Sequence, residues 1–361
     1  MTIESHTNDA PTPVSAGSAR SSRETAAGVG LSLTGSLSNQ TGAALAALAF
    51  PAIGPAGVVA VRQLIAAVTL GIVGRPTVRG LRWAQWWPIL ALAATVCVMN
   101  LALYTAIERV GLGLAVSLEF LGPLAVALWA FRRSREGLLA VIVALGVYVL
   151  VLPGPSTDYL GVGLALVAAA CWANYIVLNQ VLGQRVAGIT GTALATMIAA
   201  VVYAPLTVAL IVSGRLHGAA LGYAVAAGIL ASAIPYAVDL LALRRADPGL
   251  FATLTSLNPV WAALLGMVTL GEYLTAHEWI GMSLIVASNV AAVLSLRRAA
   301  SRSRAAAPEL PLTALPIQAP PVDQLPGDDQ LPGNAVVSPG RSRVPFVRPL
   351  CSRRRPRTAH R

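Results

Sequence analysis

Ten long apolar segments occupy the chain between residues 30 and 296, and they restrict the possible folds more than any other feature. A helix needs roughly 20 residues, at about 1.5 Å rise each, to cross a lipid bilayer. The segments are 30–53, 56–74, 86–107, 111–131, 136–153, 159–182, 188–212, 219–243, 248–270 and 277–296. Most gaps between them are too short for an extramembrane domain. We therefore predict an all-α integral membrane protein with ten transmembrane helices.

The composition excludes a water-soluble protein of this size. Residues are 56% hydrophobic and 11% charged, whereas soluble domains are about 25% charged. The net charge is +11, and all 26 basic residues are arginines. Twelve of them lie from Arg297 onward. Most of the others lie in short gaps between apolar segments. This pattern indicates membrane topology rather than phosphate recognition, so we expect membrane lipids and no nucleic acid as partners.

The arginines also predict the orientation of the chain. Thirteen lie in the N-terminal tail, in alternate gaps and directly after the last segment, whereas the other gaps hold only Arg109 and Arg215. Loops rich in Lys and Arg stay on the cytoplasmic side. We expect a multi-pass protein of the bacterial inner membrane with both termini in the cytoplasm.

Both ends of the chain differ in composition from the apolar region. Residues 1–28 are rich in Ser, Thr, Ala and Pro, and 299–361 are rich in Pro and Arg. Such segments cannot bury enough apolar surface to fold, so we predict two disordered cytoplasmic tails. The basic C-terminal tail is suited to contact anionic lipid headgroups.

An internal repeat divides the apolar region. "IERVGLGLAVSLEFLGPLAVALW" (107–129) aligns with "LRRADPGLFATLTSLNPVWAALL" (243–265) at a constant offset, so that Pro123 meets Pro259. Each copy is the fourth segment of a five-segment unit. We predict repeats over 29–153 and 159–298, inserted with opposite orientations, as in many secondary transporters.

The sequence lacks the constellations of enzymes, metal sites and ATP-driven pumps. Its three cysteines are far apart, no Cys/His spacing fits a metal, and no Walker motif occurs. We expect no enzyme activity, no metal and no cofactor. The sequence carries no signal for an oligomeric state.

Glu119 is the strongest candidate for a functional residue. A carboxylate near the bilayer centre costs about 2.5–3.5 kcal/mol on insertion scales, so intramembrane acids mark functional sites. Pro123, four residues later, removes the N–H that would bond the Glu119 carbonyl. The pair predicts a polar pocket at a broken helix turn, with Glu119 taking up and releasing a proton.

The second copy has uncharged groups at the matching turn. Pro259 removes the partner of the Thr255 carbonyl, and Asn258 adds an amide. These residues either line the pathway or serve helix packing alone, since prolines kink helices and small polar residues favour helix contacts.

Several other polar or aromatic residues lie within the apolar segments. Arg62 either pairs with Glu119, holds a substrate carboxylate, or extends to the outer headgroups. Asp239 either neutralises the nearby Arg244 and Arg245, or serves as a cytoplasmic gate or a contact to the substrate amine. The remaining candidates for the substrate pathway are Asn100, Tyr104, Trp172, Asn174 and Tyr236.

The stretches "GLAVSLEFLGPLAVALWAFRR", "ACWANYIV", "AIPYAVDLLALRR" and "LNPVWAALLGMVTLGEYLT" resemble the EamA-type carriers of the drug/metabolite transporter superfamily, and within it the bacterial threonine/homoserine exporters. The resemblance implies ten helices in two inverted repeats and export of small amino acids in exchange for protons. The resemblance implies a longer acidic residue at the position of Asp239. This departure means that the substrate can differ in detail from that of the subgroup.

We therefore expect a transmembrane efflux carrier for small amino acids that works by proton antiport. Two alternatives stay open at this point. One is an EamA-type exporter of another metabolite or a drug. The other is a membrane sensor or assembly subunit that uses the arginine-rich tail as its output.

Overall fold

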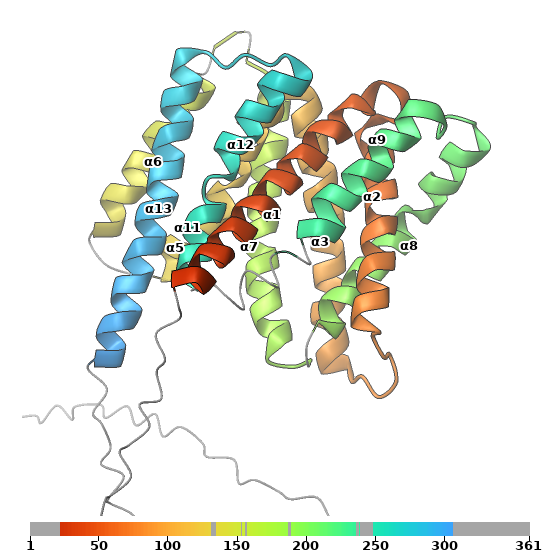
Figure 1. The fold of residues 1–361 in the computed structure, drawn as a ribbon, viewed down its shortest axis with the longest axis horizontal. Helices are drawn as coiled ribbons and strands as arrows, with labels where there is room; N and C mark the ends of the chain where they lie inside the picture. The colour runs from red at the N-terminus through yellow and green to blue at the C-terminus, as the bar shows by residue number, and fades with distance from the viewer. Residues whose placement is uncertain are drawn as a thin grey trace, which may run out of the picture. The chain divides into compact units, whose positions relative to one another are not determined.

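The computed structural model describes residues 22–305, except 131–134, 153, 156, 187–188, 236–237 and 239–247. Within these residues the regular elements are all helical (Figure 1). In chain order they are α1 (Ser22–Leu48), α2 (Phe50–Gly74), α3 (Trp83–Val110), α4 (Leu112–Glu119), α5 (Leu121–Ala130), α6 (Arg135–Val151), α7 (Tyr159–Gly183), α8 (Thr190–Val212), α9 (Gly218–Gly228), the π-helical turn η1 (Ile229–Ala233), α11 (Pro248–Thr255), α12 (Asn258–Leu265), the π-helical turn η2 (Gly266–Leu270) and α13 (Ala276–Ala305).

Seven helical segments of the described chain are long and apolar enough to cross a membrane. They include the α4–α5 pair and the run from α11 through η2, and α6 and α9–η1 contain two shorter apolar segments. The predicted all-helical membrane architecture is confirmed. The count of ten crossings stays a prediction, which requires α1 to cross as well. Buried polar side chains of α1, among them Ser32, Ser36 and Gln40, lower its hydropathy although they face the protein interior.

The helix boundaries differ from the predicted segments at both ends. α1 begins at Ser22, inside the predicted tail 1–28, and α13 continues to Ala305, beyond the predicted tail boundary at 299. Alanine-rich sequence has high helix propensity, so both helices extend past their apolar parts. The predicted gap at 54–55 is a kink within α2, where Gly54 has a positive φ of 70°.

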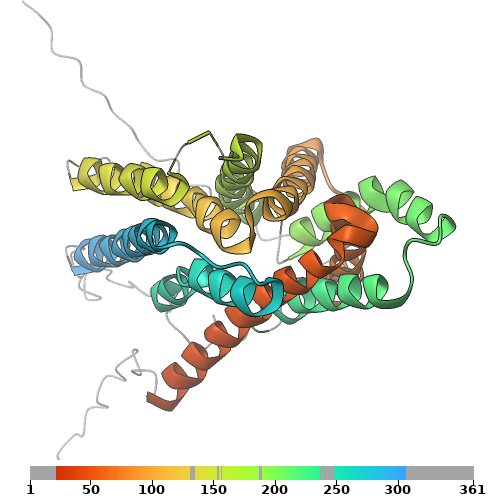
Figure 2. The ribbon, with the colours of Figure 1, turned by 90° about the horizontal axis from the view of Figure 1, so that it is seen from above.

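The two predicted halves interlock instead of forming separate bodies. α2 packs against α8, α4 against α12 and α6 along α13, and Figure 2 shows the last pair side by side. α3 packs against α7, and α1 packs against α9. When the halves are exchanged, the pair of α2 with α8 and the pair of α6 with α13 each map onto themselves, and the pairs of α3 with α7 and α1 with α9 map onto each other. The contact pattern therefore fits an internal repeat.

Small residues permit the closest helix contacts. A Cβ at Gly122 of α5 would overlap the carbonyl of Ala169 in α7, and one at Gly281 of α13 would overlap the backbone of Leu150 in α6. Lipid tails are as apolar as the side chains, so close backbone packing is a main source of helix association in membranes. Glycine at these two positions lets helices of the two halves approach.

Glu272, after η2, caps the N-terminus of α4. Its carboxylate accepts a hydrogen bond from the Leu112 N–H at 2.7 Å, and negative charge is favourable at a helix N-terminus. Gly111 has a φ of 85°, and a Cβ there would lie 3.0 Å from the same carboxylate. The cap thus ties the ninth predicted segment to the fourth.

We expect Glu272→Gln to gain stability relative to the wild type as the pH rises above the ordinary carboxyl pKa of about 4.3. Burial raises the pKa of the Glu272 carboxyl, and the bond from Leu112 only partly opposes this shift. A raised folded-state pKa stabilises the fold in acid, and that contribution is lost as the pH passes the folded value. Thermal unfolding in detergent micelles checks this, and parallel pH curves would contradict it. Glu272→Ala should be about 1 kcal/mol less stable than Glu272→Gln, because it removes the cap.

Candidate functional site

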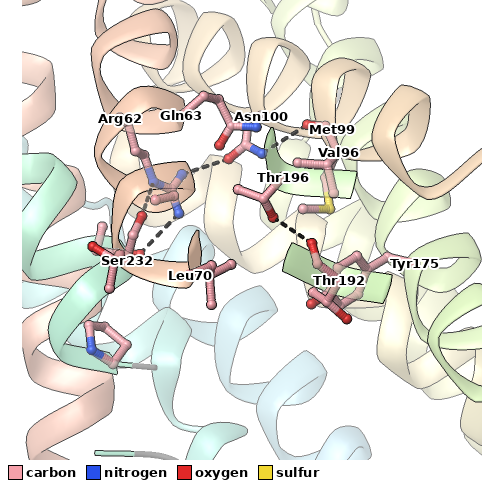
Figure 3. A pocket seen from close by; sticks show the side chains of 14 residues that line it. Arg62, Gln63, Leu70, Val96, Met99, Asn100, Tyr175, Thr192, Thr196 and Ser232 are labelled. Atoms are coloured by element: carbon pink, nitrogen blue, oxygen red, sulfur yellow. Dashed lines mark hydrogen bonds between the residues drawn. The ribbon is translucent and has the colours of Figure 1, made fainter. Parts of the chain in front are cut away.

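Arg62 lies in the middle of α2, and three neighbouring groups hold its guanidinium (Figure 3). Nη1 donates to Asn100 Oδ1 at 2.6 Å, Nε to Ser232 Oγ at 3.2 Å, and Nη2 to the Ala231 carbonyl at 3.1 Å. Ala231 and Ser232 belong to η1, and π-helical turns frequently occur at functional sites. These bonds use three of the five guanidinium donors. Up to two remain for a ligand.

Tyr104 completes the surroundings of Arg62. The guanidinium carbon lies 5.4 Å from the centroid of the Tyr104 ring, within the range of a cation–π contact. The ring is fully buried and packs edge-on against Phe50. The structure therefore brings together three predicted site residues, Arg62, Asn100 and Tyr104. The alternative in which Arg62 extends to the headgroups is wrong, because its bonds go to α3 and η1.

A cavity of about 250 Å³ lies beside the guanidinium, between α2, α3, α7, α8 and η1. Its wall is lined by Arg62, Gln63, Ala66, Thr69, Leu70, Val96, Met99, Asn100, Tyr175, Thr192, Thr196, Ala231, Ser232 and Pro235. Drug-sized ligands occupy pockets of about 300–1,000 Å³. This cavity therefore suits a smaller solute.

Several polar residues line this cavity that are not among the predicted site residues. They include Gln63, Thr192, Thr196 and Ser232. Thr192 donates its hydroxyl to Asn179 Oδ1 at 3.0 Å, and Thr196 donates to the Thr192 carbonyl at 3.0 Å. Both hydroxyl oxygens can therefore still accept hydrogen bonds from a ligand. The sequence signal for these residues is weak. Gln63 is a polar residue that directly follows Arg62 in an apolar segment, but single threonines and serines are common in membrane helices and do not indicate a site.

Glu119 is the last residue of α4 and is 7% exposed. It attracts Arg62 electrostatically, but the two form no ion pair among the residues that the structure describes, where Arg109 pairs with Asp158 at 3.0 Å. The predicted direct pairing is therefore wrong. The next residue, Phe120, packs edge-on against Trp172 with ring centroids 4.7 Å apart, which places Trp172 beside the break and outside the cavity wall.

Both copies of the repeat are broken at the matching turn. α4 covers 112–119 and α11 covers 248–255, so the two helices coincide under the offset that aligns the sequences. Pro123 and Pro259 lie in the first turns of α5 and α12, where a helix does not need their missing N–H. Each proline therefore starts a new helix after a break.

The polar residues of the second break have different surroundings. Thr255 donates its hydroxyl to the Ala252 carbonyl at 3.0 Å. Asn258 is 8% exposed, and its Oδ1 has no hydrogen-bond partner in the described chain. Neither residue lines the cavity beside Arg62.

One further predicted site residue, Asn174, serves a contact between helices, and two others fall outside the described part of the chain. Asn174 of α7 donates to Thr95 Oγ1 of α3 at 2.8 Å, which is a contact between helices. Tyr236 and Asp239 lie outside the described residues. The candidate site is therefore the cavity beside Arg62. Glu119 lies outside the cavity wall and interacts electrostatically with the Arg62 guanidinium.

The arrangement can bind a small zwitterion. A fixed cation with free donors favours a carboxylate, and hydroxyl oxygens on the opposite wall can accept from an ammonium group. A buried carboxyl group that interacts with the cation can exchange a proton. Among the described residues no group of three His, Cys, Asp or Glu side chains could hold a metal ion.

Comparison with known proteins relates the chain to transporters. The model of the EamA-like transporter family matches residues 159–294. The threonine/homoserine exporters RhtA of Escherichia coli K12 and Salmonella typhimurium LT2 are each 35% identical over 262 residues, which cover 72% of this chain and 88% of the relative. The uncharacterized transporter YwfM of Bacillus subtilis is 28% identical over 215 residues, or 56% of this chain and 72% of the relative.

A solved crystal structure shares the fold. It covers 76% of this chain and 99% of its own, with a TM-score of 0.53 and 19% sequence identity. At this identity the likeness concerns the fold alone.

We expect Asn100→Ala to destabilise the protein by about 1.5–3 kcal/mol, because a hydrogen bond to a buried charge is lost. Thermal unfolding in micelles measures the change. Asn179→Ala is the matched control: its amide bonds only neutral groups, so its loss should cost about 1 kcal/mol. Equal losses in the two variants would contradict the role of Asn100 in holding Arg62.

Proposed function

Because the chain belongs to the EamA-like transporter family, we propose that it exports small amino acids of the threonine/homoserine type across the bacterial inner membrane. The family consists of transporters, and the chain is a multi-pass membrane transporter and not an enzyme. The similarity to the RhtA exporters supports the substrate class. Membrane lipids surround the carrier, and the amino acid is its small-molecule partner.

The observation that carries this proposal is the prepared guanidinium beside a small cavity. Arg62 is held in place by Asn100 and η1 before any substrate arrives, so little side-chain entropy is lost when a ligand binds. Its free donors take the substrate carboxylate. The hydroxyl oxygens of Thr192 and Thr196 accept from the ammonium group.

We propose Glu119 as the group that carries the proton in an antiport cycle. When ionised, Glu119 attracts Arg62, and when protonated, it does not. Uptake or release of a proton therefore changes the electrostatic field at the guanidinium that takes the substrate carboxylate, which would couple the proton to the substrate. Its burial at the end of α4 and its interaction with Arg62 support this role.

For the topology we propose ten crossings in two inverted five-helix repeats, with both termini cytoplasmic. The shared break of α4 and α11 and the exchange symmetry of the helix contacts support the repeat.

The clustering of loops at two ends supports the same topology. Arg185, after α7, donates to the Ala84 carbonyl at the start of α3 at 2.9 Å and lies 5.1 Å from the Trp87 ring. The connection before α3, which holds three arginines, and the connection after α7, which holds Arg185, therefore share one end, which is the lower end in Figure 1. Other connections carry the acidic residues. Arg109, at the end of α3, pairs with Asp158 before α7, and Glu272, after η2, lies against Gly111 and Leu112 at the start of α4. A tryptophan and an arginine in contact fit a membrane interface.

We expect cells that express the chain to export radiolabelled threonine and homoserine, and Arg62→Lys to lower that export at least about tenfold. Lysine cannot keep the bonds to α3 and η1 and also take both carboxylate oxygens. Arg75→Lys, at the exposed end of α2, is the matched control and should export normally. Threoninol, which lacks the carboxylate, should not inhibit threonine flux in proteoliposomes. Wild-type cells that export neither amino acid would overturn the substrate class.

We expect Glu119→Gln to exchange threonine for threonine across proteoliposomes but to lose transport driven by a pH gradient. Glutamine keeps the size of the side chain and cannot carry the proton. Flux is measured with and without an imposed gradient, in the variant and in the wild type. A variant that responds to the gradient as the wild type does would remove Glu119 from the proton pathway.

A further inference from the structure

Gln63 has an unsatisfied hydrogen-bond donor in the wall of the cavity. The residue is 3% exposed, and its Nε2 has no partner among the described residues. More than about 90% of buried polar groups have a partner, and leaving one unpaired costs about 1–3 kcal/mol. The described part of the empty carrier thus leaves this donor without an acceptor.

Neighbouring polar groups in the same wall are satisfied. Asn100 accepts from Arg62 and donates its Nδ2 to the Val96 carbonyl at 2.8 Å. Thr69 donates to the Ile65 carbonyl at 2.8 Å. Other buried polar atoms without a partner, such as Asn258 Oδ1 and Trp261 Nε1, belong to residues outside the cavity wall. The free donor at Gln63 is therefore a feature of this cavity.

Gln63 and Arg62 are consecutive residues of α2, and both line the cavity (Figure 3). Consecutive side chains on a helix point about 100° apart, so the amide and the guanidinium face different parts of one small ligand. If Arg62 takes the carboxylate of an amino acid, the amide N–H must find another oxygen. On a small amino acid, an oxygen other than those of the carboxylate comes from the side chain.

We propose that Gln63 is a specificity-determining residue that donates a hydrogen bond to the side-chain hydroxyl oxygen of the substrate. This inference rests on the proposed function and adds the group that the carrier recognises beyond the amino-acid backbone. The substrate hydroxyl can in turn donate a hydrogen bond to the hydroxyl oxygen of Thr192 or Thr196, because these two hydroxyls already donate their own hydrogens elsewhere. A hydroxyl amino acid satisfies both sides, whereas its deoxy analogue leaves the Gln63 amide unpaired.

The test compares threonine with 2-aminobutyrate, the analogue that lacks the hydroxyl of both threonine and homoserine. The ratio of their inhibition constants is measured against threonine flux in proteoliposomes. We expect the wild type to prefer threonine by at least about tenfold, because a site built around a hydroxyl rejects ligands that lack it. Gln63→Leu should bring the ratio close to one. Thr207→Val, in α8 but outside the cavity wall, is the control and should leave the ratio unchanged.

Each other outcome overturns the proposal in a recognisable way. An unchanged ratio in Gln63→Leu, with threonine still exported, removes Gln63 from substrate recognition and leaves the proposed function standing. An equal loss of affinity for both compounds assigns Gln63 to the carboxylate and also overturns the inference. A wild type that transports neither compound overturns both proposals.

A stability measurement guards against a folding defect. Gln63→Leu should unfold at the same temperature as the wild type or higher, because it removes an unpaired buried donor. Gln63→Met, which is unbranched like glutamine, serves as the second variant and should show the same loss of preference. A wild type more stable than both variants in the absence of amino acids would show that the amide already has a partner, and would overturn the proposal.

Discussion

The hydrogen bonds that hold Arg62 are the interaction on which the arrangement of this transporter depends. A guanidinium does not lose its proton in proteins, so its charge must be stabilised wherever α2 places it. Asn100 of α3 and the π-helical turn η1 supply that stabilisation from both predicted halves of the chain. The same bonds fix the orientation of the charge toward the cavity. A structural requirement of burying arginine thus produces a prepared anion site.

The breaks in the fourth and ninth predicted segments place polar groups inside the helix bundle. A proline in the first turn of a new helix lets the chain interrupt its hydrogen bonds without leaving an N–H unpaired. Glu119 ends the helix before one break, and Thr255 ends the helix before the other. The repeat therefore supplies two similar interruptions but only one carboxylate. This asymmetry lets one half carry the titrating group while the other contributes neutral polar atoms.

The short helix α4 links two carboxylates, the Glu272 cap and the buried Glu119. Glu272 lies at its N-terminus and Glu119 at its C-terminus. Both carboxylates therefore meet the same helix. Alternating access in repeat-based transporters is largely a rigid movement of one bundle against the other, and α4, which belongs to the first predicted half, packs against α7 and α12 of the second.

The sequence alone determined the all-helical membrane class, and it predicts the ten segments and the repeat, because apolar length, arginine distribution and the Pro123/Pro259 alignment are local or additive signals. It also identified Arg62, Asn100 and Tyr104, since polar groups in apolar segments are costly. Only the tertiary structure decided that Arg62 bonds to η1 instead of Glu119 and that Asn174 joins two helices. It also decided that Gln63 lines the cavity with a donor that no described residue pairs. These features depend on which faces of different helices meet, and no spacing along one segment encodes that.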